Sequence, residues 1–89
     1  MKSLYSNQPD GQTIALMVIG WIVAEPSRSD RFLTLTGLDA EQLRAGLNDP
    51  GILAAVLDFL MGHERDLIAC AEATGLTPDA IVAARGEMG

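Results

Sequence analysis

The sequence is poor in the residue types from which catalytic and metal sites are most often built. Among its 89 residues there is one cysteine and one histidine, and aromatic residues make up only 4%. The single cysteine, Cys70, allows no disulfide within the chain and fits a reducing compartment. Because aromatic side chains are scarce, we expect a core of Leu, Ile, Val, Ala and Met, which suits a helical domain.

No apolar run is long enough to predict a membrane span. The longest run, IALMVIGWIVA at residues 14–24, has eleven residues, whereas a span needs about 18 or more. It has the length of a signal-peptide core, but Pro9 and Asp10 precede it and no Ala-x-Ala cleavage site follows it. We therefore expect a cytoplasmic protein with no membrane partner.

Basic residues are also scarce. Six Lys and Arg stand against twelve Asp and Glu, for a net charge of −6, and from Asp49 onward seven acidic side chains face only Arg65 and Arg85. Such a surface repels phosphate backbones over about a Debye length, so the charge disfavours nucleic acid as a partner.

Apolar periodicity and capping residues predict an all-α fold, a small compact bundle of four to five helices. We expect a flexible tail at residues 1–8 and a single helical domain at residues 9–89. The first helix, up to about Glu25, is apolar all round and is therefore expected to be central and the most buried. The later helices are expected at residues 30–36 with Ser27 or Ser29 as its cap, at 40–47, from Pro50 with a break or kink at Gly62, and at 78–87.

The tripeptide Thr-Gly-Leu occurs twice and predicts two tight helical corners. Gly37 and Gly75 stand where a helix ends in the left-handed conformation, which glycine adopts without steric cost. Asp39 and Thr77 then cap the next helix, and Gln42 completes a capping box with Asp39. The flanks of the two corners do not align, so we expect no repeated functional unit.

The second corner also has the spacing of a helix-turn-helix, carried by Ala71, Gly75, Leu76 and Ile81. DNA reading would require Lys, Arg, Asn or Gln on the following helix. The exposed candidates there are Asp79, Ala83, Arg85 and Glu87. A DNA-binding regulator therefore stays an alternative that the charge disfavours.

The stretch GHERDLIAC contains the only histidine, but it has no second histidine to complete a zinc-protease motif. On one helix, His63 and Cys70 would lie about 10 Å apart along the axis, too far for a thiolate–imidazole pair. A metal site from His63, Asp66 and Cys70 would need further ligands. The sequence also contains no glycine-rich phosphate loop. We expect no catalytic residue, no metal and no cofactor, and hence no enzyme.

Three arginines are candidate partner-binding residues. Arg28, Arg31 and Arg44 hold half of the six basic residues within seventeen positions. In the simpler interpretation these arginines form salt bridges at the surface. In the more specific interpretation they form a patch that faces a protein partner. We expect Trp21 in the core rather than as an exposed anchor.

The apolar content is high for a chain that can bury only about three-fifths of its surface. This excess favours a non-catalytic protein-interaction module, with another protein or a second copy of the chain as its partner. Binding of a small apolar ligand between helices is a further alternative.

Several segments together form a distinctive combination: Trp21, Arg31-Phe32-Leu33, Gly37-Leu38, Leu43-Arg44, LAAVLDFL at residues 53–60, Glu64 and Gly75-x-x-Pro78. With them the chain resembles a family of short bacterial proteins, the domain of unknown function 3572, over all but about its first dozen residues. The resemblance implies a small soluble helical protein of the bacterial cytoplasm. It implies no activity, cofactor or site.

Overall fold

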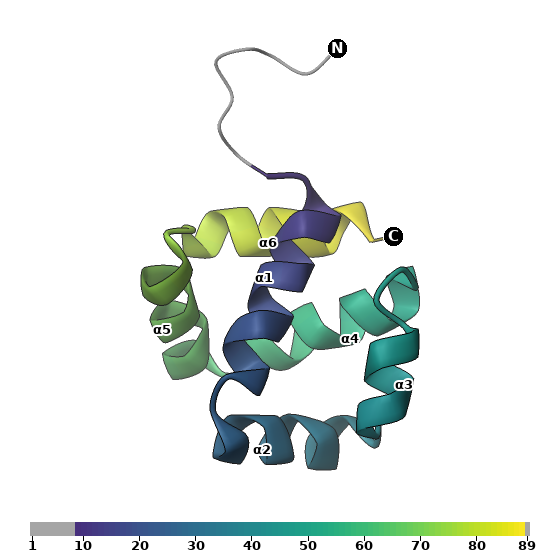
Figure 1. The fold of residues 1–89 in the computed structure, drawn as a ribbon. Helices are drawn as coiled ribbons and strands as arrows, with labels where there is room; N and C mark the ends of the chain where they lie inside the picture. Colours follow the sequence, from purple (N-terminus) through teal and green to yellow (C-terminus); the bar gives the residue numbers. More distant parts are fainter. Residues whose placement is uncertain (1–8, 89) are drawn as a thin grey trace.

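The computed structural model describes residues 9–88 and folds them into helices only (Figure 1). These are α1 (Gly11–Val23), α2 (Pro26–Thr36), α3 (Ala40–Ala45), α4 (Pro50–Met61), α5 (Glu64–Thr74) and α6 (Pro78–Glu87). The all-α prediction is confirmed for this part of the chain. The predicted tail at residues 1–8 lies outside the described residues.

The expected number of four to five helices is wrong, since residues 9–88 form six. The chain breaks at Gly62, as predicted, and this break separates α4 from α5. The N–H of Gly62 donates to the carbonyl of Asp58, and that of His63 donates to Leu60, both at 3.0 Å. The last turn of α4 therefore closes before α5 begins, so the segments before and after Gly62 are two separate helices.

The second helix begins at Pro26 rather than at Asp30, which corrects the predicted boundary. Its cap is Glu25, whose carboxylate accepts the Ser27 N–H at 3.0 Å and the Ser27 hydroxyl at 2.6 Å. These two hydrogen bonds, the one from the hydroxyl more strongly than the one from the N–H, hold the pKa of the Glu25 carboxyl below its ordinary value. Proline fits the first helical position because its missing N–H has no partner there.

Both Thr-Gly-Leu corners form as predicted. Gly37 and Gly75 have φ angles of 75° and 77°. The Asp39 carboxylate accepts the Gln42 N–H at 2.7 Å, and the Gln42 side chain accepts the Asp39 N–H at 2.9 Å. The Thr77 hydroxyl accepts the N–H of the third residue of α6 at 3.1 Å. Each corner thus ends one helix and caps the next within a few residues.

The first helix, α1, has one buried side and one exposed side. It packs against α2, α4, α5 and α6, with Ile14, Val18 and Ile22 almost completely buried. In Figure 1 it passes in front of α4 and α6. On its other side, the side chains of Leu16 and Val23 are 39% and 48% exposed. An apolar helix therefore contributes both to the core and to the surface.

The two corner glycines lead to a test of backbone strain. We expect Gly37→Ala and Gly75→Ala each to lower the free energy of unfolding by about 1–2 kcal/mol, because a Cβ disfavours positive φ. An added Cβ at either position would meet no atom within 4 Å, so the cost is purely conformational. Gly86→Ala, in α6 and equally unobstructed, is the control and should be neutral or stabilising. Urea unfolding followed by circular dichroism measures all three, and equal stability of the corner variants and the wild type would contradict the strain argument.

Candidate functional site

The structure places Arg28 against Trp21, where α1 meets α2. The guanidinium carbon of Arg28 lies 3.8 Å from the centroid of the Trp21 ring, and Nη2 donates to the Trp21 carbonyl at 2.6 Å. The indole is half-buried and packs against the core. A guanidinium over an indole face is an attractive cation–π contact, so this pair fastens the start of α2 to α1.

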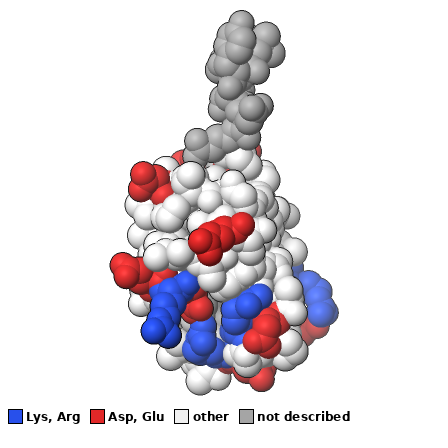
Figure 2. Space-filling view, turned by 90° about the vertical axis from the view of Figure 1, so that its left-hand side faces the viewer, with Lys and Arg blue, Asp and Glu red and all other residues white. Residues whose placement is uncertain are grey.

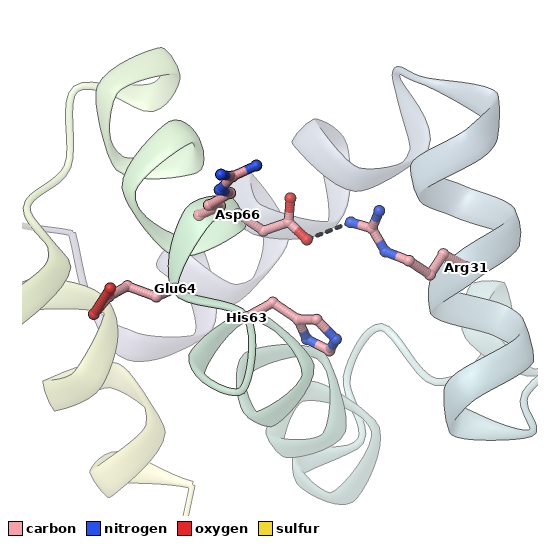
Figure 3. Close-up of a pocket in the computed structure, with 5 residues that line it drawn as sticks. Arg31, His63, Glu64 and Asp66 are labelled. Carbon is pink, nitrogen blue, oxygen red and sulfur yellow. Dashed lines mark hydrogen bonds and ion pairs between the residues drawn. The ribbon is translucent and has the colours of Figure 1, made fainter.

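The two other candidate arginines have separate partners. Arg31 of α2 forms an ion pair with Asp66 of α5, across the gap between these helices (Figure 3). Arg44 pairs with Glu41 within α3 at 2.8 Å, and both side chains are largely exposed. Nothing among the described contacts joins the three arginines into one cluster. Figure 2 shows the side of the molecule that lies on the left in Figure 1. Its Lys and Arg side chains lie only in the lower part, among Asp and Glu, and the charged side chains above them are all acidic.

A cleft of about 410 Å³ opens where α5 begins, lined by Arg31, His63, Glu64, Arg65 and Asp66. In Figure 3, Arg31 and Asp66 point toward each other, whereas Glu64 points away from them. The His63 ring packs on Phe59 with centroids 4.8 Å apart, and its Nδ1 lies 2.7 Å from the Phe59 carbonyl oxygen. No Ser, Thr or Cys lines this cleft, so it places no nucleophile beside the histidine.

The potential metal ligands do not converge. Among residues 9–88, no group of three or more His, Cys, Asp or Glu side chains is arranged to hold a metal ion. The side chain of Cys70 is fully buried, and this burial raises the pKa of its thiol from 9.0 to about 11. At neutral pH the thiol is therefore protonated and behaves as a small apolar side chain.

The corner between α5 and α6 has the geometry of a helix-turn-helix. The helix axes bend by 102° at this break, within the range of about 90–120° for that motif. The exposed side of α6 carries Asp79, Val82, Ala83 and Glu87. Its one arginine, Arg85, donates to the Asp58 carboxylate at 2.7 Å. The side chains that would face DNA are thus acidic or apolar.

No single helix within residues 9–88 combines the length and the apolar composition required to cross a membrane. Only α5 and α6 taken together meet those two criteria, as a sharply bent pair.

An apolar groove of about 300 Å³ lies between α1, α2 and α3. Its lining consists of Ile19, Val23, Ser29, Leu33, Ala40, Leu43, Arg44 and Leu47. The only charged side chain in it is that of Arg44. Val23 also belongs to the exposed side of α1, which continues along the helix through Gly20 to Leu16. We call Leu16, Gly20 and Val23 the outer face of α1.

The sequence indicated Arg44 but not the apolar residues around it. The run at residues 14–24 is apolar on every side, so its periodicity does not reveal which side faces solvent. The burial of Ile14, Val18 and Ile22 by other helices decides this, and leaves the outer face uncovered.

These features define a compact all-α domain with three ion pairs among residues 9–88 and with an α1 that is only partly covered. The chain belongs to the family described as "Protein of unknown function (DUF3572)", whose model matches residues 8–89. This match confirms the resemblance seen in the sequence. No curated protein and no solved structure shows significant similarity to the chain.

The buried thiol predicts a pH-dependent stability. The unfolded thiol ionises around pH 9.0, whereas the folded thiol stays protonated up to about 11. Because the unfolded state then binds fewer protons, stability should fall as the pH rises through this window. Unfolding titrations from neutral pH to pH 11 should show a loss that is absent from Cys70→Ala.

Thiol labelling checks the same burial independently. Near pH 9, where the unfolded thiol is about half ionised, alkylation of the native protein should be roughly a hundredfold slower than in urea. Equal rates in the two states would show that Cys70 is accessible in the native protein.

Proposed function

We propose that this domain is a non-catalytic protein-interaction module that binds its partner through the apolar groove and the adjoining outer face of α1. The proposal is supported above all by the exposure of Val23, at 48%, beside a groove lined mainly by aliphatic side chains. Contiguous exposed apolar surface commonly marks a protein contact. A cytoplasmic location and a bacterial origin belong to the same proposal.

Apolar burial is the driving force for this contact. Covering apolar surface is favourable by about 25 cal/mol per Å², and the outer face of α1 contains no charged residue that would lose its hydration. Leu33 and Leu47 are only partly buried against the core, so a partner in the groove would cover them as well. The same helices already fix the shape of the groove, which lowers the ordering cost of binding.

Arg44 is the arginine that we assign to partner binding. Its side chain is 73% exposed and forms an ion pair with Glu41, one turn earlier in the same helix. An exposed pair of this kind contributes about 0–1 kcal/mol, so Arg44 can exchange it for a carboxylate of the partner. Arg28 and Arg31 have a structural role in this proposal, because Arg28 holds α2 against α1 and Arg31 holds α2 against α5.

This division of roles shapes the experiment. Arg31→Glu would place a carboxylate next to Asp66, so a loss of binding could reflect a disturbed fold. Val23→Glu avoids this problem, and Val82→Glu is its matched control, since Val82 is 46% exposed on α6 outside the groove.

We expect affinity capture from a nuclease-treated lysate of the source organism to recover one protein in near-stoichiometric amount with the wild type and with Val82→Glu. Val23→Glu should lose about nine-tenths or more of it, because a buried unpaired carboxylate strongly disfavours an apolar contact. Arg44→Glu should weaken capture less. If Val23→Glu and Val82→Glu captured the partner equally well, the groove and the outer face would be ruled out as the binding surface.

A further inference from the structure

Nothing within a single copy of the chain requires a glycine at position 20. It lies in α1, it does not have the positive φ found at Gly37 and Gly75, and an added Cβ would meet nothing within 4 Å. Alanine would fit the same space and is the better helix former. A glycine there is explained if another surface approaches the helix backbone from outside.

Other helical glycines show what an internal reason looks like. An added Cβ at Gly11 would lie 2.8 Å from the Glu87 carboxylate, and Gly11 itself is buried. Gly86 resembles Gly20 in having free space around it, but it lies in the last turn of α6, where the backbone carbonyls have no partner within the helix. Gly20 is different because it lies at the middle of an exposed apolar face.

The spacing of the outer face suits a helix–helix contact. Leu16, Gly20 and Val23 are at positions i, i+4 and i+7, so they lie on one side of α1. In Figure 1 this helix crosses the front of the molecule between α5 and α3, with nothing drawn over it. The face has no charge, which matters for self-association because two chains of net charge −6 repel unless they meet through uncharged surface.

We infer that the outer face of α1 binds a second copy of this chain, with two α1 helices crossing antiparallel at Gly20 around a two-fold axis. This inference rests on the proposed function and names its partner. A two-fold interface requires a patch that complements itself. With Gly20 opposite Gly20, Leu16 of one copy meets Ala24 of the other, and Met17 meets Val23, so that larger side chains face smaller or shorter ones.

The interface extends beyond the two helices. A helix of this length spans about 20 Å, and one face of it supplies only part of the roughly 800 Å² per chain that a standard interface buries. The apolar groove adjoins this face at Val23. It supplies further apolar area and brings Arg44 to the edge of the contact.

Sedimentation equilibrium over a range of concentrations tests the inference. The wild type should reach twice its chain mass of 9.4 kDa. Gly20→Leu should remain folded by circular dichroism and raise the dimer Kd by about tenfold or more, because the added side chain separates the helices. Gly86→Leu, the matched control, should leave the Kd unchanged.

A disulfide provides a positive test of the two-fold geometry. In a Cys70→Ala background, Gly20→Cys should form an interchain disulfide under mild oxidation, because the two positions face each other across the axis. Gly86→Cys should not. A wild type that is monomeric at every concentration, or a Gly20→Leu dimer as tight as the wild type, would overturn the inference.

The same experiments separate this inference from the broader proposal. A monomeric wild type whose captured partner is lost with Val23→Glu would overturn self-association and leave the interaction module in place. A dimer that withstands both Gly20→Leu and Val23→Glu would overturn the inference, and it would overturn the proposed function as well only if Val23→Glu also left capture unchanged.

Discussion

The arrangement of this domain depends on covering one side of α1. Ile14, Val18 and Ile22 form that side and are almost completely buried, and four of the other five described helices pack against α1. Few aromatic residues are available to add area, although Phe32 of α2 meets Phe59 of α4 edge-to-face at 5.2 Å. The buried core of residues 9–88 is therefore mainly aliphatic, with α1 and α4 contributing its largest shares.

Polar contacts join the helices mainly at the margin of that core. No polar or charged residue among those described is buried. Instead, Arg31 joins α2 to α5, Arg85 joins α6 to α4, and the Glu87 carboxylate accepts the Gly11 N–H at 3.0 Å. Ion pairs at the surface contribute little free energy, so these contacts add little to the stability that the apolar core provides.

The proposed interaction follows from the same constraint. A small chain has too few helices to surround an apolar α1 completely, and α2 to α6 leave Leu16, Gly20 and Val23 at the surface. This exposure would be a liability in an isolated domain. A second copy that presents the same face would bury what the first fold leaves uncovered, with the charged residues kept at the rim.

Local signals in the sequence determined where helices begin and end: the left-handed glycines Gly37 and Gly75, the caps Asp39 and Thr77, and the break at Gly62. These depend on backbone conformation within a few residues, so they can be read along the chain. The sequence did not predict Glu25 as the cap of α2, because serine is a commoner capping residue and both Ser27 and Ser29 lie close by. Only the tertiary structure decided which side of α1 is covered and which partners Arg28, Arg31 and Arg44 have, because both depend on helices that are distant in sequence.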